Sequence, residues 1–174
     1  MLPMIEELNA LEPQDFASTL AGLFEGAPRF CARVADGRPY TDYDQLLYRA
    51  RSIAQEMPAD EQIELIDSHP RIGADPRTVS AVSYREQGYD RDTTTAALQR
   101  RLDELNTEYE RRFGFRFVVH VAGRPRSEIA DVMESHLDAS RGDELRRGLT
   151  DVFAIARDRA TNLSSSTEEG SADR

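Results

Sequence analysis

A histidine followed by a proline is the first pair of residues in this sequence that suits catalysis. His69 precedes Pro70, whose ring keeps the residue before it out of the α-helical region, so the imidazole is presented on a fixed backbone at a helix end. An imidazole with its ordinary pKa of about 6.5 acts as a general acid or base near neutral pH. A histidine at a helix end also stabilises the last carbonyl groups of that helix, and the local sequence favours neither role.

The second candidate group is the sequence SYREQ, which covers residues 83–87. Ser-x-x-Glu is typical of a capping box, in which Ser83 accepts a hydrogen bond from the backbone of Glu86 and the Glu86 side chain returns one. That structural role is the commoner meaning of the pattern. Gln87 adds an amide that both donates and accepts, and such a group complements the edge of a urea or a lactam.

Arg159 is the third candidate, because of its helical phase. Counted from Val152, Arg159 falls on the apolar face of the last predicted helix, whereas Arg157 lies at the margin of that face. A buried arginine must be paired or must face a pocket, since an unpaired buried charge is costly. Two interpretations follow: a pair with an internal carboxylate, or a planar fork that holds the carboxylate of a ligand.

Helices are the elements predicted to position these residues. Apolar residues at helical spacing, with prolines and glycines at the ends, predict helices over residues 13–24, 28–34, 42–56, 58–66, 94–112, 127–137 and 143–163. The run FRFVVHV is short, β-branched and aromatic, so we expect it to be extended and buried, and one such run cannot form a sheet. The fold class is therefore predicted to be all-α, a single-domain helical bundle of about seven or eight helices.

The length of 174 residues is that of one domain. We predict a helical domain over residues 1–163 and a flexible polar tail over residues 164–174, which read SSSTEEGSADR. His136 falls on the inward face of its helix and is interpreted as a core histidine with satisfied partners. His120, inside the apolar run, fits a core or a site equally well.

Composition excludes several classes of function. The net charge of −10 disfavours nucleic acid and anionic membranes as partners. All 22 basic residues are arginine, so a lysine Schiff base and pyridoxal phosphate are excluded. One cysteine and three histidines without zinc-ligand spacing disfavour a metal site. No apolar run approaches the ~20 residues of a membrane span, and secretory and peroxisomal signals are not recognisable, which favours a soluble cytoplasmic protein.

Taken together and in order, four motifs carry a resemblance to a known family. They are HPRIG (69–73), SYREQ (83–87), LNTEYERRFGFRFVV (105–119) and IARDR (155–159). The sequence closely resembles the decarboxylases of 2-oxo-4-hydroxy-4-carboxy-5-ureidoimidazoline (OHCU) from about Leu8 to about Leu163. This family of lyases forms S-allantoin in urate degradation, within purine metabolism.

The resemblance implies an all-helical, cofactor-free, commonly dimeric enzyme with an anionic ureido substrate. It implies catalytic roles for His69, Glu86 and Arg159. The substrate-binding positions that it implies are Pro70, Ser83, Tyr84, Arg85, Glu86, Gln87, Phe117, Val118, Val119, His120 and Val121, the last five largely through backbone groups. The family often carries an arginine where His136 stands and an asparagine where Ala139 stands.

The implied chemistry agrees with the exclusions made from composition. Decarboxylation needs an acceptor for the electron pair left behind, and in this substrate the departing carboxylate is adjacent to a ring C=N that accepts it. Two alternatives stay open: a lyase or hydrolase that acts on another ureido or hydantoin-like anion, and a non-enzymatic helical ligand-binding module.

Overall fold

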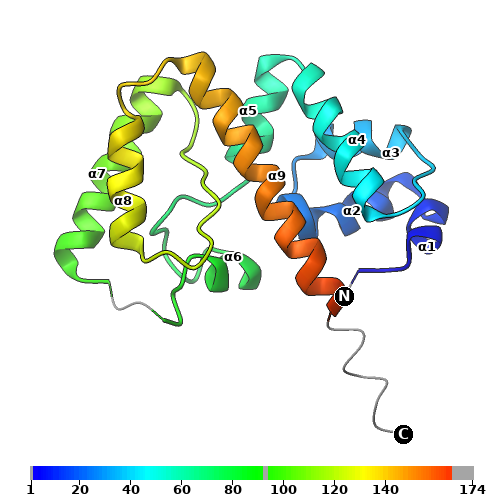
Figure 1. Ribbon diagram of the computed structural model, residues 1–174, viewed down its shortest axis with the longest axis horizontal. Helices are drawn as coiled ribbons and strands as arrows, with labels where there is room; N and C mark the ends of the chain where they lie inside the picture. Colours follow the sequence, from blue (N-terminus) through cyan, green and yellow to red (C-terminus); the bar gives the residue numbers. More distant parts are fainter. Residues whose placement is uncertain (1, 92–93, 166–174) are drawn as a thin grey trace, which may run out of the picture. The chain divides into compact units, whose positions relative to one another are not determined.

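The computed structural model describes residues 2–91 and 94–165, and within them it is all-α, as predicted (Figure 1). The described part contains nine helices and no strand. The helices are α1 (Ile5–Ala10), α2 (Pro13–Phe24), α3 (Pro28–Asp36), α4 (Tyr43–Glu56), α5 (Ala59–Asp67), α6 (Ala81–Glu86), α7 (Ala96–Phe113), α8 (Arg126–His136) and α9 (Arg141–Ser165). The count exceeds the expected seven or eight because α1 and α6 are single short helices of six residues each.

Within the all-α fold, the part of the chain that the structure describes divides into two compact units. Of the described residues, unit 1 comprises 2–68 and 149–165, and unit 2 comprises 69–91 and 94–148. Helix α9 is divided between them after Gly148. It extends to Ser165, two residues beyond the predicted domain boundary, and the rest of the predicted tail lies outside the described residues.

Unit 1 is built around helices α2 to α5 and the later turns of α9. Prolines stand at the first position of α2 and of α3, where a missing N–H costs nothing. Three rings form the centre of its core: Phe24 lies edge-on to Phe30 and Phe153, with centroid distances of 4.9 and 5.5 Å.

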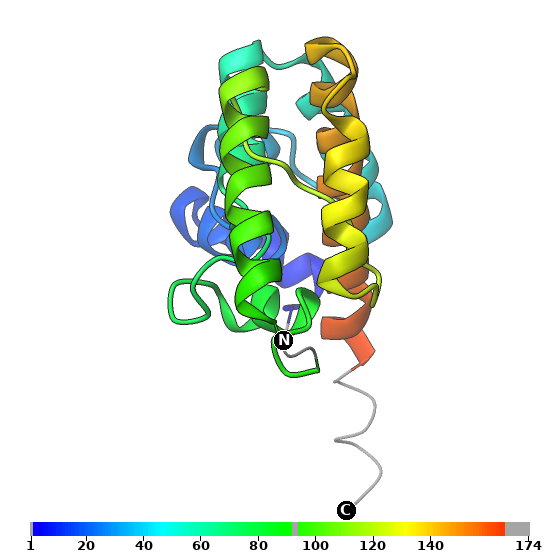
Figure 2. The same ribbon diagram turned by 90° about the vertical axis from the view of Figure 1, so that its left-hand side faces the viewer.

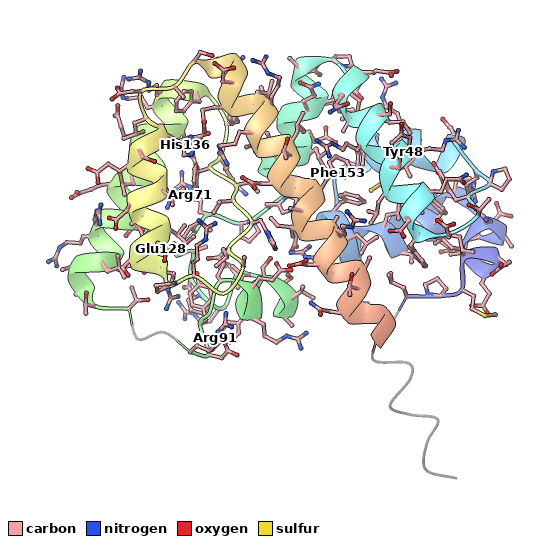
Figure 3. All side chains as sticks on the ribbon, in the orientation of Figure 1. Tyr48, Arg71, Arg91, Glu128, His136 and Phe153 are labelled. Atoms are coloured by element: carbon pink, nitrogen blue, oxygen red, sulfur yellow. The ribbon has the colours of Figure 1, made fainter. Side chains whose placement is uncertain are left out.

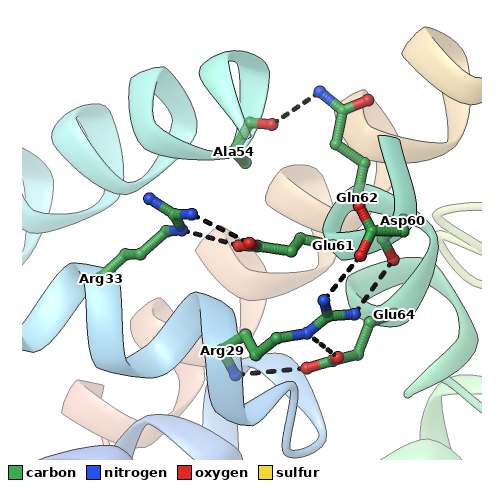
Figure 4. Close-up of polar contacts among 7 residues, drawn as sticks. All are labelled: Arg29, Arg33, Ala54, Asp60, Glu61, Gln62 and Glu64. Atoms are coloured by element: carbon green, nitrogen blue, oxygen red, sulfur yellow. Dashed lines mark hydrogen bonds and ion pairs between the residues drawn. The ribbon is translucent and has the colours of Figure 1, made fainter. Parts of the chain in front are cut away.

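Exposed ion pairs connect α3 with α5 in unit 1 (Figure 4). Arg33 forms a two-pronged contact with Glu61, through Nε at 2.7 Å and Nη2 at 2.9 Å. Arg29 bonds both Glu64 and Asp60, the latter at 2.7 Å. Because both arginine side chains are about half exposed, each pair contributes little to stability.

Unit 2 is built on α7 and α8, which run side by side (Figures 1 and 2). Helix α7 ends at Phe113 and is capped by Gly114, whose φ of +77° favours glycine. The aromatic rings of Tyr109, Phe113, Phe115 and Phe117 fill the core beside it. Residues 115–121 are neither helix nor strand, and most of their side chains are buried, as the sequence predicted.

In the part of the chain that the structure describes, helices are too short or too polar to cross a bilayer.

The single cysteine provides a test of the core of unit 1. Cys31 is 1% exposed, and burial raises the pKa of its thiol to about 11. At pH 8 the thiolate, which is the reactive form, is therefore scarce as well as inaccessible. We expect a disulfide reagent to label the native protein far more slowly than the protein unfolded in guanidinium.

Ser52→Cys supplies the control for this labelling experiment. Residue 52 lies on an exposed face of α4, so the added thiol should react at once in the folded protein. Rapid labelling of the native parent chain at Cys31 would show that this part of the core opens easily.

Candidate functional site

His69 begins the irregular segment that connects α5 with α6. Its residue is 3% exposed, and its carbonyl oxygen accepts a hydrogen bond of 3.0 Å from Nη1 of Arg116. At the end of α5, the carbonyl of Leu65 accepts from the hydroxyl of Ser68 at 2.7 Å. Ser68 thus donates to one of the last carbonyl groups of the helix, which is the structural role that the sequence also allowed for His69.

Gln87 fastens the same irregular segment from the side of α6. Its Oε1 accepts from the backbone N–H of Gly73 at 3.0 Å and from the hydroxyl of Tyr89 at 3.2 Å. Its Nε2 donates to the carbonyl of Arg71 at 3.1 Å. The amide predicted to meet a ligand is therefore bonded to the HPRIG motif itself.

Helix α7 fastens this segment from the other side. Nε2 of Gln99 donates to the carbonyl of Gly73 at 2.9 Å, and Nδ2 of Asn106 donates to the carbonyl of Ile72 at 2.9 Å. Gly73 has a φ of +77°, and a Cβ there would lie 2.9 Å from Cδ1 of Leu102. Side chains on both sides thus fix the backbone that follows His69.

The structure corrects the interpretation of Ser83 as a helix cap. The capping residue of α6 is Ser80, whose hydroxyl accepts from the N–H of Ser83 at 3.1 Å. Ser83 is the third residue of α6 and is buried. Glu86 is the last residue of the same helix. The capping-box prediction was wrong because a second serine, three residues earlier, begins the helix. Ser83 and Glu86 are thereby released from that structural role.

Two further predicted ligand residues lie on or next to α6. The ring of Tyr84 stacks on that of Tyr89 with centroids 5.2 Å apart. The guanidinium carbon of Arg126 lies 4.4 Å from the centroid of the Tyr89 ring. Arg85 is exposed, at the last turn of the short helix.

Arginine side chains hold the predicted backbone-binding segment, residues 117–121. Arg147 donates through Nη1 to the carbonyl of Val118 at 2.8 Å. Arg124 donates through Nη2 to the carbonyl of His120 at 2.7 Å and through Nε to that of Val121 at 3.1 Å. Three carbonyl oxygens of this irregular segment are thus fixed by side chains.

Sequence reasoning missed the group of residues around Glu144 that supports this segment. The side chain of Glu144 is hydrogen-bonded to Tyr109, His136 and Arg147. His136 lies near the end of α8 (Figure 3). The interpretation of His136 is thus confirmed for its partner but not for its place in the core, because its side chain is 34% exposed. The signal available in the sequence was the spacing of Glu144 and Arg147, three residues apart on one predicted helix.

Arg159 belongs to unit 1, whereas the other predicted site residues belong to unit 2. It is 3% exposed, and it bonds Oε1 of Glu25 at 2.8 Å and the carbonyl of Leu23 at 3.3 Å. The side chain of Arg157, by contrast, is 75% exposed. The predicted helical phase is confirmed, and of the two interpretations the internal carboxylate pair is present.

A pocket of about 450 Å³ lies in unit 2 beside the HPRIG motif. Residues of that motif share its wall with residues of α7, and the lining consists of Arg71, Ile72, Gly73, Ala74, Asp75, Pro76, Gln99, Asp103 and Asn106. His69, Glu86 and Gln87 do not line it, so we do not assign it to the predicted catalytic residues. Among the described residues, no three acidic, histidine or cysteine side chains are grouped as metal ligands.

Residues 9–161 match the model of the OHCU decarboxylase family, and the chain therefore belongs to that family. It is 26% identical over 152 residues to the 2-oxo-4-hydroxy-4-carboxy-5-ureidoimidazoline decarboxylase of Haloferax volcanii, covering 87% of this chain and 90% of that protein. It is 29% identical over 170 residues to a uric acid degradation bifunctional protein of Bacillus subtilis; the match covers 95% of this chain but about a third (33%) of that longer protein.

A solved structure supports the fold assignment. The crystal structure of an OHCU decarboxylase in the presence of (S)-allantoin is similar with a TM-score of 0.69 and 22% identity, over 89% of this chain and 99% of the other. The family match includes both compact units and all four motifs.

The bonds of Gln87 predict a structural cost for its loss. Gln87→Leu leaves the buried N–H of Gly73 without this partner, at a cost of about 1–3 kcal/mol, and also removes the part-buried bond to the carbonyl of Arg71. We expect a lower free energy of unfolding in urea. Gln55→Leu, on the exposed face of α4, should change it by less than about 0.5 kcal/mol, and equal effects would contradict the assignment.

The pair between Arg159 and Glu25 predicts a difference between two similar substitutions. Glu25→Gln removes the carboxylate beside a buried guanidinium, and we expect a loss of about 3 kcal/mol in unfolding free energy. Asp44→Asn removes the partner of exposed Arg157, 3.9 Å away, and should be nearly silent. Similar losses in both variants would show that the Arg159 pair is not a buried one.

Proposed function

We propose that this protein is a cofactor-independent carboxy-lyase that converts OHCU to S-allantoin in urate degradation. The observation that carries the proposal is the family match over residues 9–161, with the four motifs intact. Relatives named for this decarboxylase from Haloferax volcanii and from mouse match along about nine-tenths of their own length (90% each).

The reaction assigns three tasks to the chain. When CO₂ leaves, the electron pair moves into the ring C=N and an enol-like intermediate forms. The hydroxyl that becomes the product carbonyl must lose its proton, and the neighbouring carbon must gain one on a single face. An anionic, urea-rich molecule must be held while this happens.

We assign the two proton transfers to His69 with Glu86. The backbone after His69 is fixed by Gln87 and by α7, which suits a group that must deliver a proton in a defined direction. Glu86 stands at the last position of α6, beside Gln87, and the helix is capped by Ser80. Acid–base assistance of this kind accelerates a reaction by about 10²–10⁴-fold.

On the family resemblance, taken residue by residue, we assign substrate binding to Arg159 in unit 1 and, separately, to groups in unit 2. The contacts of Arg159 with Glu25 and Leu23 orient its planar fork before any ligand arrives. The proposed contacts in unit 2 are Pro70, Ser83, Tyr84, Arg85, Glu86, Gln87 and the backbone of residues 117–121. On the strength of the family resemblance, we also propose a cytoplasmic homodimer.

Turnover of freshly made substrate tests the function. Urate oxidised in place supplies OHCU, and circular dichroism separates enzymatic, optically active S-allantoin from the slow racemic product. We expect the wild-type protein to accelerate the appearance of the optical signal. The same rate with and without the protein would contradict the proposal and favour another ureido substrate or a binding module.

His69→Asn tests the catalytic assignment in the same assay. We expect a loss of about 10²–10⁴-fold in kcat with a thermal unfolding midpoint close to that of the wild type. Glu86→Gln should also lose activity while α6 persists, since Ser80 begins that helix. Full activity in His69→Asn would exclude it as the acid–base group.

A further inference from the structure

A buried carboxylate in unit 2 collects hydrogen bonds from three helices. Glu144 of α9 is 1% exposed. It accepts from the hydroxyl of Tyr109 in α7 at 2.6 Å and from Nε of Arg147, one turn further along α9, at 2.9 Å. Nδ1 of His136 in α8 lies 2.8 Å from its other oxygen. Because an ionised carboxylate only accepts, this histidine nitrogen is the donor. We call these four residues the Glu144 network.

Tyr109 and Arg147, which both donate to Oε2 of Glu144, keep their protons. Burial raises the pKa of the Tyr109 phenol well above its usual range, so it donates to Glu144. Burial acts to lower the pKa of the Arg147 guanidinium, but its hydrogen bonds with Tyr109 and Glu144, together with the negative charge of Glu144, raise the pKa. The arginine therefore stays fully charged beside its carboxylate.

Arg147 connects the Glu144 network to the irregular segment. While its Nε bonds Glu144, its Nη1 donates to the carbonyl of Val118 at 2.8 Å, and its Cζ lies 4.7 Å from the ring centroid of Phe117. The guanidinium thus contacts a carboxylate, a peptide oxygen and an aromatic face at once. A planar fork suits these three contacts, and the single ammonium of a lysine does not.

The contact with Val118 also determines where the next N–H points. A peptide group is planar and trans, so its C=O and N–H point in opposite directions. With the Val118 oxygen held on Arg147, the N–H of Val119 is directed away from the network. Residues 115–121 have no helical or strand pairing that would set this direction otherwise.

We propose that Arg147, held by Glu144, is a positioning residue that orients the Val118–Val119 peptide so that its N–H receives the anionic substrate. This inference rests on the proposed function, in which the backbone of residues 117–121 meets substrate. The Glu144 network holds Arg147 from one side through the carboxylate, which His136 contacts through its other oxygen.

The test compares Arg147→Lys with Arg146→Lys. Arg146 is the adjacent residue of α9, but its side chain is 74% exposed and pairs with Asp143 on the surface. In both variants charge is kept and the fork is lost. We expect Arg147→Lys to raise KM by about 10- to 100-fold with a smaller fall in kcat, because a misdirected binding group weakens substrate placement. Arg146→Lys should match the wild type.

A purely structural role would give a different kinetic result. If Arg147 only stabilised the fold, the lysine variant would contain less active protein, so kcat would fall and KM would stay unchanged. That result would overturn the proposal. Tyr109→Phe gives a milder second variant, since it removes one hydrogen bond to Glu144 and keeps the ring.

An amide measurement without substrate separates this inference from the proposed function. We expect the ¹⁵N–¹H signal of Val119 to shift, and its hydrogen exchange to quicken, in Arg147→Lys and not in Arg146→Lys. An unchanged Val119 signal would overturn the positioning role whatever the substrate is. If Arg147→Lys shows these amide effects but the wild-type protein does not convert OHCU, the proposed function alone is contradicted.

Discussion

Buried peptide groups outside the helices are the constraint on which the candidate site depends. A helix satisfies its own N–H and C=O groups, but the segments after His69 and after Gly114 do not, and buried peptide groups without partners are costly. In the described chain the partners are long polar side chains: Gln87 and Asn106 for the first segment and Arg147 for the second. The side chains that make these segments stable also determine the direction of their backbone groups.

Two arginines, Arg147 and Arg159, meet the same constraint through their planar forks. An arginine can bond a carboxylate with one edge and a carbonyl with another, as Arg147 does with Glu144 and Val118, and as Arg159 does with Glu25 and Leu23. Both carboxylates are largely buried, so each pair must be well satisfied to offset the loss of water. The exposed pairs between α3 and α5 use the same chemistry with little energetic effect.

Local patterns predicted the long helices and the phase of α9 because helical period and proline or glycine ends are properties of neighbouring residues. Thus α2 and α4 lie within a residue of their predicted bounds, and Arg159 is buried while Arg157 is exposed. The cap of α6 was misassigned because Ser80 and Ser83 both fit a capping pattern, and only the chain direction before the helix decides between them. The Glu144 network was missed because Tyr109 and Glu144 are 35 residues apart, and the packing of three helices brings them together.

Cofactor-free decarboxylation makes the direction of backbone and side-chain groups the main contribution of the protein. If the substrate supplies its own electron acceptor, the chain need not supply an imine or a metal, and its effect comes from holding the anion and directing protons. Groups held in advance do this without reorganisation during the reaction. A histidine on a backbone bonded from two sides meets that requirement, and so does the proposed peptide N–H whose carbonyl is held by the partly buried Arg147. The polar contacts that satisfy the irregular segments are, on this argument, the same contacts that give the site its geometry.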